Sequence, residues 1–212
     1  MLQGWIQIGL TLVIIIAITP IFGGYIARVY LGQKTLLDRV VNPIESLIFK
    51  VIDVQPKLQM TGWQYARSIL FSNLAMAILL LAILMLQGIL PLNPTGLGAP
   101  SWDTALHTTI SFITNTNQQH YSGETTYSYF SQVLGLGLMF FTSAGTGIAV
   151  SIAFIRGLTG RPLGNFYADL IQAITRILLP ISIVGAIALV AAGTPETLSG
   201  PIVVPTLEDP NL

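Results

Sequence analysis

Cysteine is absent from this 212-residue sequence, and charged residues are scarce at 8%. Without cysteine, neither a disulfide nor thiol chemistry is possible. A soluble domain carries roughly 25% charged residues, whereas 52% of this chain is hydrophobic and its mean hydropathy is +0.72. Nine basic residues balance nine acidic ones, which gives no basis for nucleic-acid binding. The composition therefore predicts a membrane protein.

Four apolar runs, of which the first three are uncharged, are long enough to cross about 30 Å of hydrocarbon, which takes roughly 20 helical residues. They are residues 5–27, 69–90, about 133–155 and about 174–192. Arg176 lies close to the start of the fourth run, and we expect its side chain to extend toward the membrane interface. The sequence thus predicts an all-α polytopic membrane protein with four transmembrane helices.

All nine lysines and arginines fall within two segments, residues 28–67 and 156–176. If the four spans alternate in direction, these segments share one compartment, which the positive-inside rule assigns to the cytoplasm. The N-terminus, residues 91–127 and the C-terminal tail are then expected outside. The outer segments carry only acidic charges, at Asp103, Glu124, Glu196, Glu208 and Asp209. We expect their field to attract cations.

Between the second and third spans, residues 102–113 place apolar side chains at helical spacing. Ser101 is a suitable N-cap, and Asp103 lies in the first turn, where the helix dipole favours a negative charge. An apolar segment of about 10–14 residues is too short to cross a bilayer and is typical of a re-entrant or interfacial helix. We therefore predict a re-entrant helix here.

This helix is followed by the polar stretch TNTNQQHYSGE, residues 114–124. Irregular backbone at membrane depth is stable only where it is buried in protein or lines a water-filled cavity. Carbonyl oxygens at the end of a short helix, together with threonine and asparagine oxygens, can replace the hydration shell of a monovalent cation. A span, a re-entrant pore helix, a filter loop and a second span form the repeat of a potassium-type channel, which is the interpretation we favour. The alternative is an external helix followed by an ordinary turn.

The stretch SFITNTNQQHYSGETTYSYFSQ, residues 111–132, resembles the first filter region of the potassium-translocating A subunit of Kdp-type ATP-driven potassium importers. The motifs PLNP (91–94), SWDTAL (101–106) and TGIAV (146–150) agree with that family. The resemblance implies that Thr114, Asn115, Thr116 and Asn117 bind K⁺ and line one quarter of a selectivity filter, and that Gln119 stands at the filter glutamine. One departure is Gln118, because the family often has an aromatic residue there.

The resemblance also implies partners and a location. Family members work with a P-type subunit that hydrolyses ATP and with small accessory membrane subunits, in the bacterial inner membrane. This chain has no GxxxxGK[ST] loop for nucleotide phosphates, so we expect a non-catalytic, ion-translocating subunit with K⁺ as the transported ion and no catalytic residue.

The family carries four span, pore-helix, span repeats, whereas this chain has one filter loop. We expect an extra N-terminal helix at 1–28, a cytoplasmic linker with an interfacial helix at 29–67, and the first repeat at 68–156. A cytoplasmic loop with the first span of an incomplete second repeat follows at 157–192, and then an external Pro-rich acidic tail at 193–212. The missing filter repeats would come from the remainder of the subunit or from other chains. The alternative is a non-conducting membrane remnant or an assembly protein.

Three further patterns carry smaller predictions. Asn42-Pro43-Ile44-Glu45 has the order of an N-cap, a first-turn proline and a capping-box glutamate, followed by apolar residues at positions 44, 47, 48 and 51. This pattern predicts an interfacial helix, or one buried against the subunit. The small residues of the third span predict close helix packing. His120 and Glu124 have the spacing of a helical metal pair, but the intervening Ser122-Gly123 indicates a turn, and enzyme chemistry is disfavoured.

Overall fold

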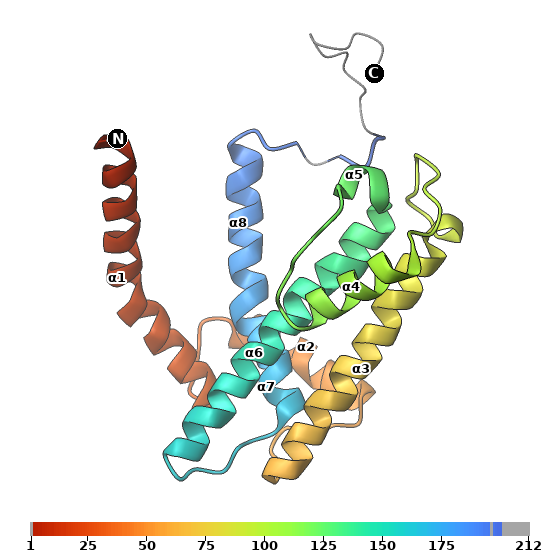
Figure 1. Cartoon of the computed structure of the whole chain (residues 1–212). Helices are drawn as coiled ribbons and strands as arrows, with labels where there is room; N and C mark the ends of the chain where they lie inside the picture. The colour runs from red at the N-terminus through yellow and green to blue at the C-terminus, as the bar shows by residue number, and fades with distance from the viewer. Residues whose placement is uncertain (1, 196, 201–212) are drawn as a thin grey trace.

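The computed structural model describes residues 2–195 and 197–200, and within these ranges the chain is entirely helical outside its loops (Figure 1). The helices are α1 (Leu2–Tyr30), α2 (Asp38–Val51), α3 (Gly62–Leu86), η1 (Gln87–Ile89), α4 (Trp102–Ile113), α5 (Gly123–Thr126), η2 (Ser131–Leu136), α6 (Gly137–Leu158), α7 (Phe166–Gln172), η3 (Ala173–Leu178) and α8 (Leu179–Ala191). Of the expected external tail, Glu196 and residues 201–212 lie outside the described residues.

Four continuous helical stretches are long and apolar enough to cross a membrane: Gln3–Tyr30, Gly62–Ile89, Ser131–Leu158 and Phe166–Ala191. The prediction of an all-helical protein with four candidate spans is confirmed, but the second and fourth helices begin earlier than their apolar runs. The second begins after a reciprocal capping box between Thr61 and Gln64. The fourth begins after Asn165, whose side-chain oxygen accepts from the N–H groups of Tyr167 and Ala168.

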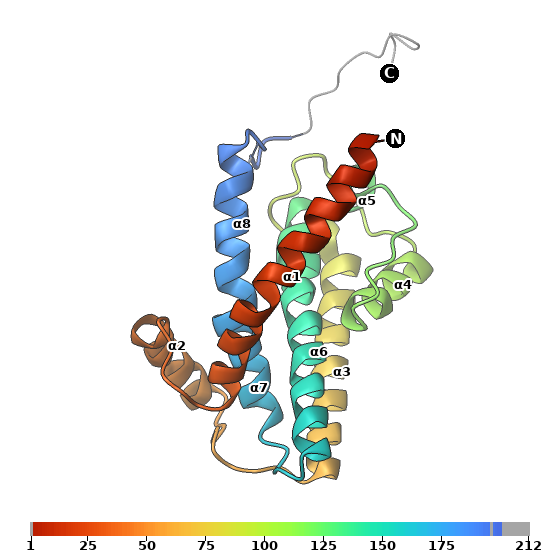
Figure 2. The same ribbon diagram turned by 90° about the vertical axis from the view of Figure 1, so that its left-hand side faces the viewer.

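The spans are arranged so that the loops between them gather at two opposite ends (Figures 1 and 2). One end carries α2, which follows α1, and the connection between α6 and α7. The other end carries α5 and the beginning of α1, and α4 lies obliquely beside the half of α3 and α6 nearest to this end. The basic loops therefore share one end of the molecule.

The core consists of two clusters, one where α3 and α6 pack against α4 and one where α3 and α6 pack against α7. Leu80 and Leu84 of α3 and Met139 of α6 are fully buried with Phe112 of α4. A Cβ atom on Gly135 would lie 3.1 Å from Leu80, and the corresponding atom on Gly145 would lie 3.0 Å from Leu170. Both glycines belong to the third span and allow the close helix packing predicted for its small residues, whereas Gly147 of the same span faces open space.

The predicted start of α2 at Asn42 is wrong. The helix begins at Asp38 and contains Pro43. Its first turn is stabilised by Thr35, whose N–H and hydroxyl donate to the Asp38 carboxylate at 3.0 and 2.7 Å. Glu45 is buried, whereas the apolar side chains at 44, 47 and 51 are exposed. The polar side of α2 therefore faces the protein, and its placement at a membrane interface remains a prediction.

Candidate functional site

The candidate site is built on α4. This helix has the predicted bounds, residues 102–113, and one of its sides packs against α3 and α6. Thr108, Thr109 and Phe112 are buried on that side. Ser101 is at the N-cap position, although its hydroxyl donates to the Thr104 hydroxyl at 2.9 Å and accepts from no backbone N–H of the helix. The polar Ser101 side chain nearby lowers the pKa of Asp103, which favours a negative charge at the positive end of the helix.

The loop after α4 is held by Ser111, which lies in the last turn of the helix. The N–H groups of Thr116 and Asn117 both donate to the Ser111 carbonyl, at 2.9 and 3.1 Å. The Gln118 N–H donates to the Ser111 hydroxyl at 2.6 Å, and this hydroxyl donates back to the Gln118 carbonyl at 3.0 Å. Three consecutive N–H groups therefore point toward one residue.

This convergence determines where the carbonyl groups point. In a trans peptide the C=O points opposite to the N–H of the same plane, so the carbonyls of Asn115, Thr116 and Asn117 point away from Ser111. Within the described part of the chain, these three oxygens accept no hydrogen bond. Asn115 and Asn117 have φ angles of 59° and 55°, and alternation between right- and left-handed backbone is the geometry that gathers successive N–H groups on one side.

The side chains of the predicted site residues differ in their surroundings. Thr114, Asn115 and Thr116 are exposed, and the hydroxyls of the two threonines are 2.8 Å apart. The Asn115 side-chain oxygen accepts from Ser143 of α6 at 3.3 Å. The corresponding oxygen of Asn117 is buried and has no partner among the described residues. Gln119 is exposed, and in the part of the chain described here no hydrogen bond joins it to the other four.

Sequence reasoning missed Gln87, which lies just after α3 and supports the loops at that end of the molecule. Its side chain is fully buried. Its amide nitrogen donates to the carbonyls of Gly98 and Thr126, while its oxygen accepts from the Ser128 N–H and the Ser131 hydroxyl, both at 3.0 Å. A glutamine at the end of an uncharged apolar run was the available signal.

The two histidines of the chain, His107 and His120, lie on α4 and in the polar loop that follows it. The Nε2 atoms of His107 on α4 and His120 are 2.9 Å apart. Glu124 does not join them in a helical pair, because Gly123–Thr126 is a separate short helix and the Ser122 hydroxyl donates to the Glu124 carboxylate at 2.7 Å. That hydrogen bond lowers the pKa of Glu124.

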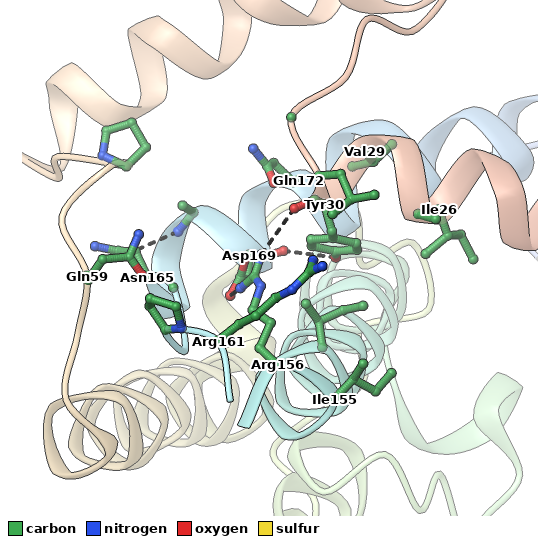
Figure 3. Close-up of a pocket in the computed structure, with 18 of the residues that line it drawn as sticks. Ile26, Val29, Tyr30, Gln59, Ile155, Arg156, Arg161, Asn165, Asp169 and Gln172 are labelled. Atoms are coloured by element: carbon green, nitrogen blue, oxygen red, sulfur yellow. Dashed lines mark hydrogen bonds and ion pairs between the residues drawn. The ribbon is translucent and has the colours of Figure 1, made fainter. Parts of the chain in front are cut away.

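A second missed feature lies at the opposite end of the molecule. Arg156 of α6 forms an ion pair of 2.8 Å with Asp169 of α7, and the Tyr65 hydroxyl donates to the same carboxylate oxygen at 3.1 Å. These residues lie at or beside a cavity of about 950 Å³ between the end of α1, α6 and α7, where Figure 3 shows Arg156, Asp169 and Tyr30 close together. The cavity does not include the filter loop, so it adds no residue to the candidate site.

The expected position of Arg176 is wrong. The side chain does not extend toward the interface, because the helix begins ten residues earlier in sequence, at Phe166, and Arg176 is buried in η3. It forms ion pairs with Asp38 at 2.6 Å and Glu45 at 2.7 Å, and it also donates to Asn42. Asn42 and Glu45, which the sequence pattern assigned to a helix cap, therefore bind Arg176.

The fold and the candidate site together define a multi-pass helical membrane protein with a short helix and a polar loop between its second and third candidate spans. The sequence model of the potassium-transporting ATPase A subunit family matches residues 9–211. The chain belongs to this family.

Individual relatives agree. The chain is 68% identical to the potassium-transporting ATPase potassium-binding subunit of Microcystis aeruginosa, over 100% of this chain and 36% of the relative. It is 64% identical to the subunit of the same name from Nostoc sp., over 97% of this chain and 37% of the relative. It is 63% identical to the subunit from Synechocystis sp., over 98% of this chain and 37% of the relative. The chain thus spans little more than a third of the length of these curated relatives and aligns with their N-terminal portion.

Proposed function

We propose that this chain supplies one K⁺-binding filter loop to the potassium-binding subunit of an ATP-driven potassium importer. In this proposal α4 is a re-entrant pore helix, and Thr114, Asn115, Thr116 and Asn117 form the loop that binds the ion. Gln119 borders it. The observation that carries the proposal is the convergence of three N–H groups on Ser111, because it leaves three successive carbonyl oxygens available on the opposite side.

The chemistry suits a monovalent cation. Backbone carbonyls that replace the hydration shell are the ligands of potassium filters, and the end of α4 adds the partial negative charge of its last carbonyls. The outer segments add Asp103 and Glu124 and contain no lysine or arginine. The relatives are named potassium-binding subunits, which supports K⁺ as the transported ion.

A single loop provides oxygens from one direction. We propose that the other filter loops come from the remainder of the A subunit or from other chains, and that ATP is hydrolysed by a separate P-type subunit with small accessory membrane subunits beside it. This chain is then a non-catalytic part of a bacterial inner-membrane complex. Its N-terminus and C-terminal tail lie outside.

The experiment that tests the proposal changes Ser111 in a full-length A subunit carrying this segment. Ser111→Ala removes the hydroxyl that accepts from the Gln118 N–H, and an unsatisfied buried group costs about 1–3 kcal/mol. At about 1.4 kcal/mol per decade, we expect the apparent affinity of potassium uptake to fall about 10- to 100-fold with the complex still assembled.

Thr109→Val is the matched control, because Thr109 is buried on the same helix and its hydroxyl has no partner among the described residues. Equal potassium affinity in both variants would contradict a role of Ser111 in shaping an ion site. A full-length subunit that never restores growth at low potassium would favour the alternative of a non-conducting remnant or assembly protein.

A further inference from the structure

The two histidines of the chain lie side by side. The sequence contains two histidines and no cysteine, so they are its only imidazole or thiol ligands. His107 lies on α4 and His120 lies 13 residues later, in the loop directly after Gln119, yet their Nε2 atoms are 2.9 Å apart. The fold therefore places both imidazole side chains of the chain in contact with each other.

The rings are not arranged as an ideal hydrogen-bonded pair. Their centroids are 4.0 Å apart and their planes are inclined by 44°. Because the centroids are little further apart than the two nitrogens, the rings lie obliquely face to face and not end to end. The other ring nitrogen of His107, Nδ1, is buried and has no partner among the described residues. The contact between the rings therefore leaves part of their bonding capacity unused.

The separation of the nitrogens fits a shared metal ion. Two imidazole nitrogens bound at about 2.0–2.1 Å to one ion and at right angles lie about 2.9 Å apart. Right angles between neighbouring ligands belong to the tetragonal geometry that Cu²⁺ and Ni²⁺ prefer with nitrogen and oxygen ligands. A small rotation of the rings would direct both lone pairs to one point.

The surroundings favour a cation. Asp103 lies one turn before His107 on α4, and Glu124 lies four residues after His120. Both carboxylates are exposed, and residues 91–127 contain no lysine or arginine. A divalent ion would therefore approach a negative surface without a competing positive charge from this segment.

We propose that His107 and His120 form a two-histidine binding site for a divalent transition-metal ion of the Cu²⁺ and Ni²⁺ class, with water in the remaining positions. The bound ion links α4 to the residue that follows Gln119. It thereby restrains the outer end of the candidate filter loop. The site is held by elements of this chain alone, and it does not depend on the potassium function.

Copper binding to the purified chain tests this site directly. The protein is prepared without a polyhistidine tag and titrated with CuCl₂, NiCl₂ and MgCl₂ by isothermal calorimetry. We expect one Cu²⁺ per chain, weaker Ni²⁺ binding in accordance with the Irving–Williams order, and no Mg²⁺ binding, because Mg²⁺ prefers oxygen ligands. The electron paramagnetic resonance spectrum of bound Cu²⁺ should show two coordinated imidazole nitrogens.

The variants His107→Gln and His120→Gln should each weaken Cu²⁺ binding at least tenfold and reduce the coordinated nitrogens from two to one. Glu124→Gln removes a charge from the same loop without removing an imidazole, and it should keep both nitrogens. His120 is exposed, so its replacement should leave the far-ultraviolet circular dichroism unchanged and separates loss of the ligand from loss of the fold. Absence of Cu²⁺ binding in the unaltered chain, or a two-nitrogen spectrum in either histidine variant, would overturn the site.

Discussion

The guanidinium of Arg176 forms a forked pair with the carboxylate of Glu45, with Nε 2.8 Å from one oxygen and Nη2 2.7 Å from the other. The two residues are 131 positions apart in the sequence. Because both side chains are buried, the pair joins α2 to the fourth candidate span away from water. This connection fixes the linker against the membrane domain.

Removing Arg176 should strongly destabilise the fold. Arg176→Met leaves Glu45 buried without its positive partner, and breaking a buried pair costs about 3–5 kcal/mol. Arg161→Met is the control, because Arg161 is exposed and forms no ion pair within the described residues. An exposed substitution of this kind changes stability by about 0.5 kcal/mol or less. The free energy of unfolding in mixed detergent micelles, followed by circular dichroism, measures both, and similar losses would contradict the structural role of the pair.

Asp38 should make stability depend on pH in the acid range. Hydrogen bonds from Thr35 and then from Arg176 lower the pKa of Asp38 from 3.8 to about 2. Above 3.8 the carboxylate is charged in the folded and the unfolded chain, and its stabilisation is fully present. As the pH falls from 3.8 toward 2 the unfolded chain takes up the proton first, so the stabilisation is lost.

The measurement compares Asp38→Asn with the unaltered chain. At neutral pH the variant should unfold more easily, and the difference should shrink below pH 3.8 and be lost as the pH falls through about 2. A difference that stays constant over this range would show that the carboxylate charge is not the cause.

Helix positions were predictable from the sequence because their signals are local. The polar residues around 101 and 114 delimit α4, and uninterrupted apolar length identifies the four candidate spans. The start of α2 was wrong because Asn42 and Glu45 match a capping pattern yet bind Arg176, a contact that no local window contains. Thr35-x-x-Asp38 also matches a capping-box pattern and lies closer to the observed start, although the residue at the N-cap position is Leu37 and the Thr35 hydroxyl donates to the Asp38 carboxylate.

The candidate site was predictable in part. The polar stretch and its position after a short helix indicated Thr114–Asn117, and asparagine is among the residues enriched at positive φ. The role of Ser111 was not predictable, because it depends on how residues 115–118 turn back over the end of α4. The contact between His107 and His120 depends on the same turn.

The direction of the spans can be measured by labelling. The chain lacks cysteine, and Thr95, Thr197 and Gln33 are exposed, so single cysteines at these positions are suitable probes. An impermeant thiol reagent added outside intact cells should label cysteines at 95 and 197 but not at 33, because the positive-inside rule assigns the basic loops to the cytoplasm. Labelling at 33 alone would reverse the orientation.

A positive charge at Gln119 should reduce potassium affinity in a full-length subunit. Gln119→Arg places a guanidinium beside the proposed ion, and two unit charges about 4 Å apart repel by about 4 kcal/mol at an effective dielectric constant of 20. That energy corresponds to nearly three decades of affinity at about 1.4 kcal/mol each. Gln119→Glu, a variant of similar size and opposite charge, should not show this loss. Unchanged high-affinity uptake with Gln119→Arg would remove Gln119 from the site.

The 212-residue chain alone should not conduct potassium selectively, although its loop is organised by its own Ser111. A potassium ion in a filter exchanges its hydration oxygens for protein oxygens, and a single loop supplies only one side of that shell. Water on the other side would leave the ion partly hydrated and abolish discrimination against sodium. Lipid there would leave backbone groups unsatisfied at several kcal/mol each.

The measurement is ion flux from liposomes with a potassium gradient, with the chain alone and with the remaining part of an A subunit added. Flux only after complementation supports the single-loop proposal, whereas selective flux from the chain alone would mean that several copies assemble a complete filter.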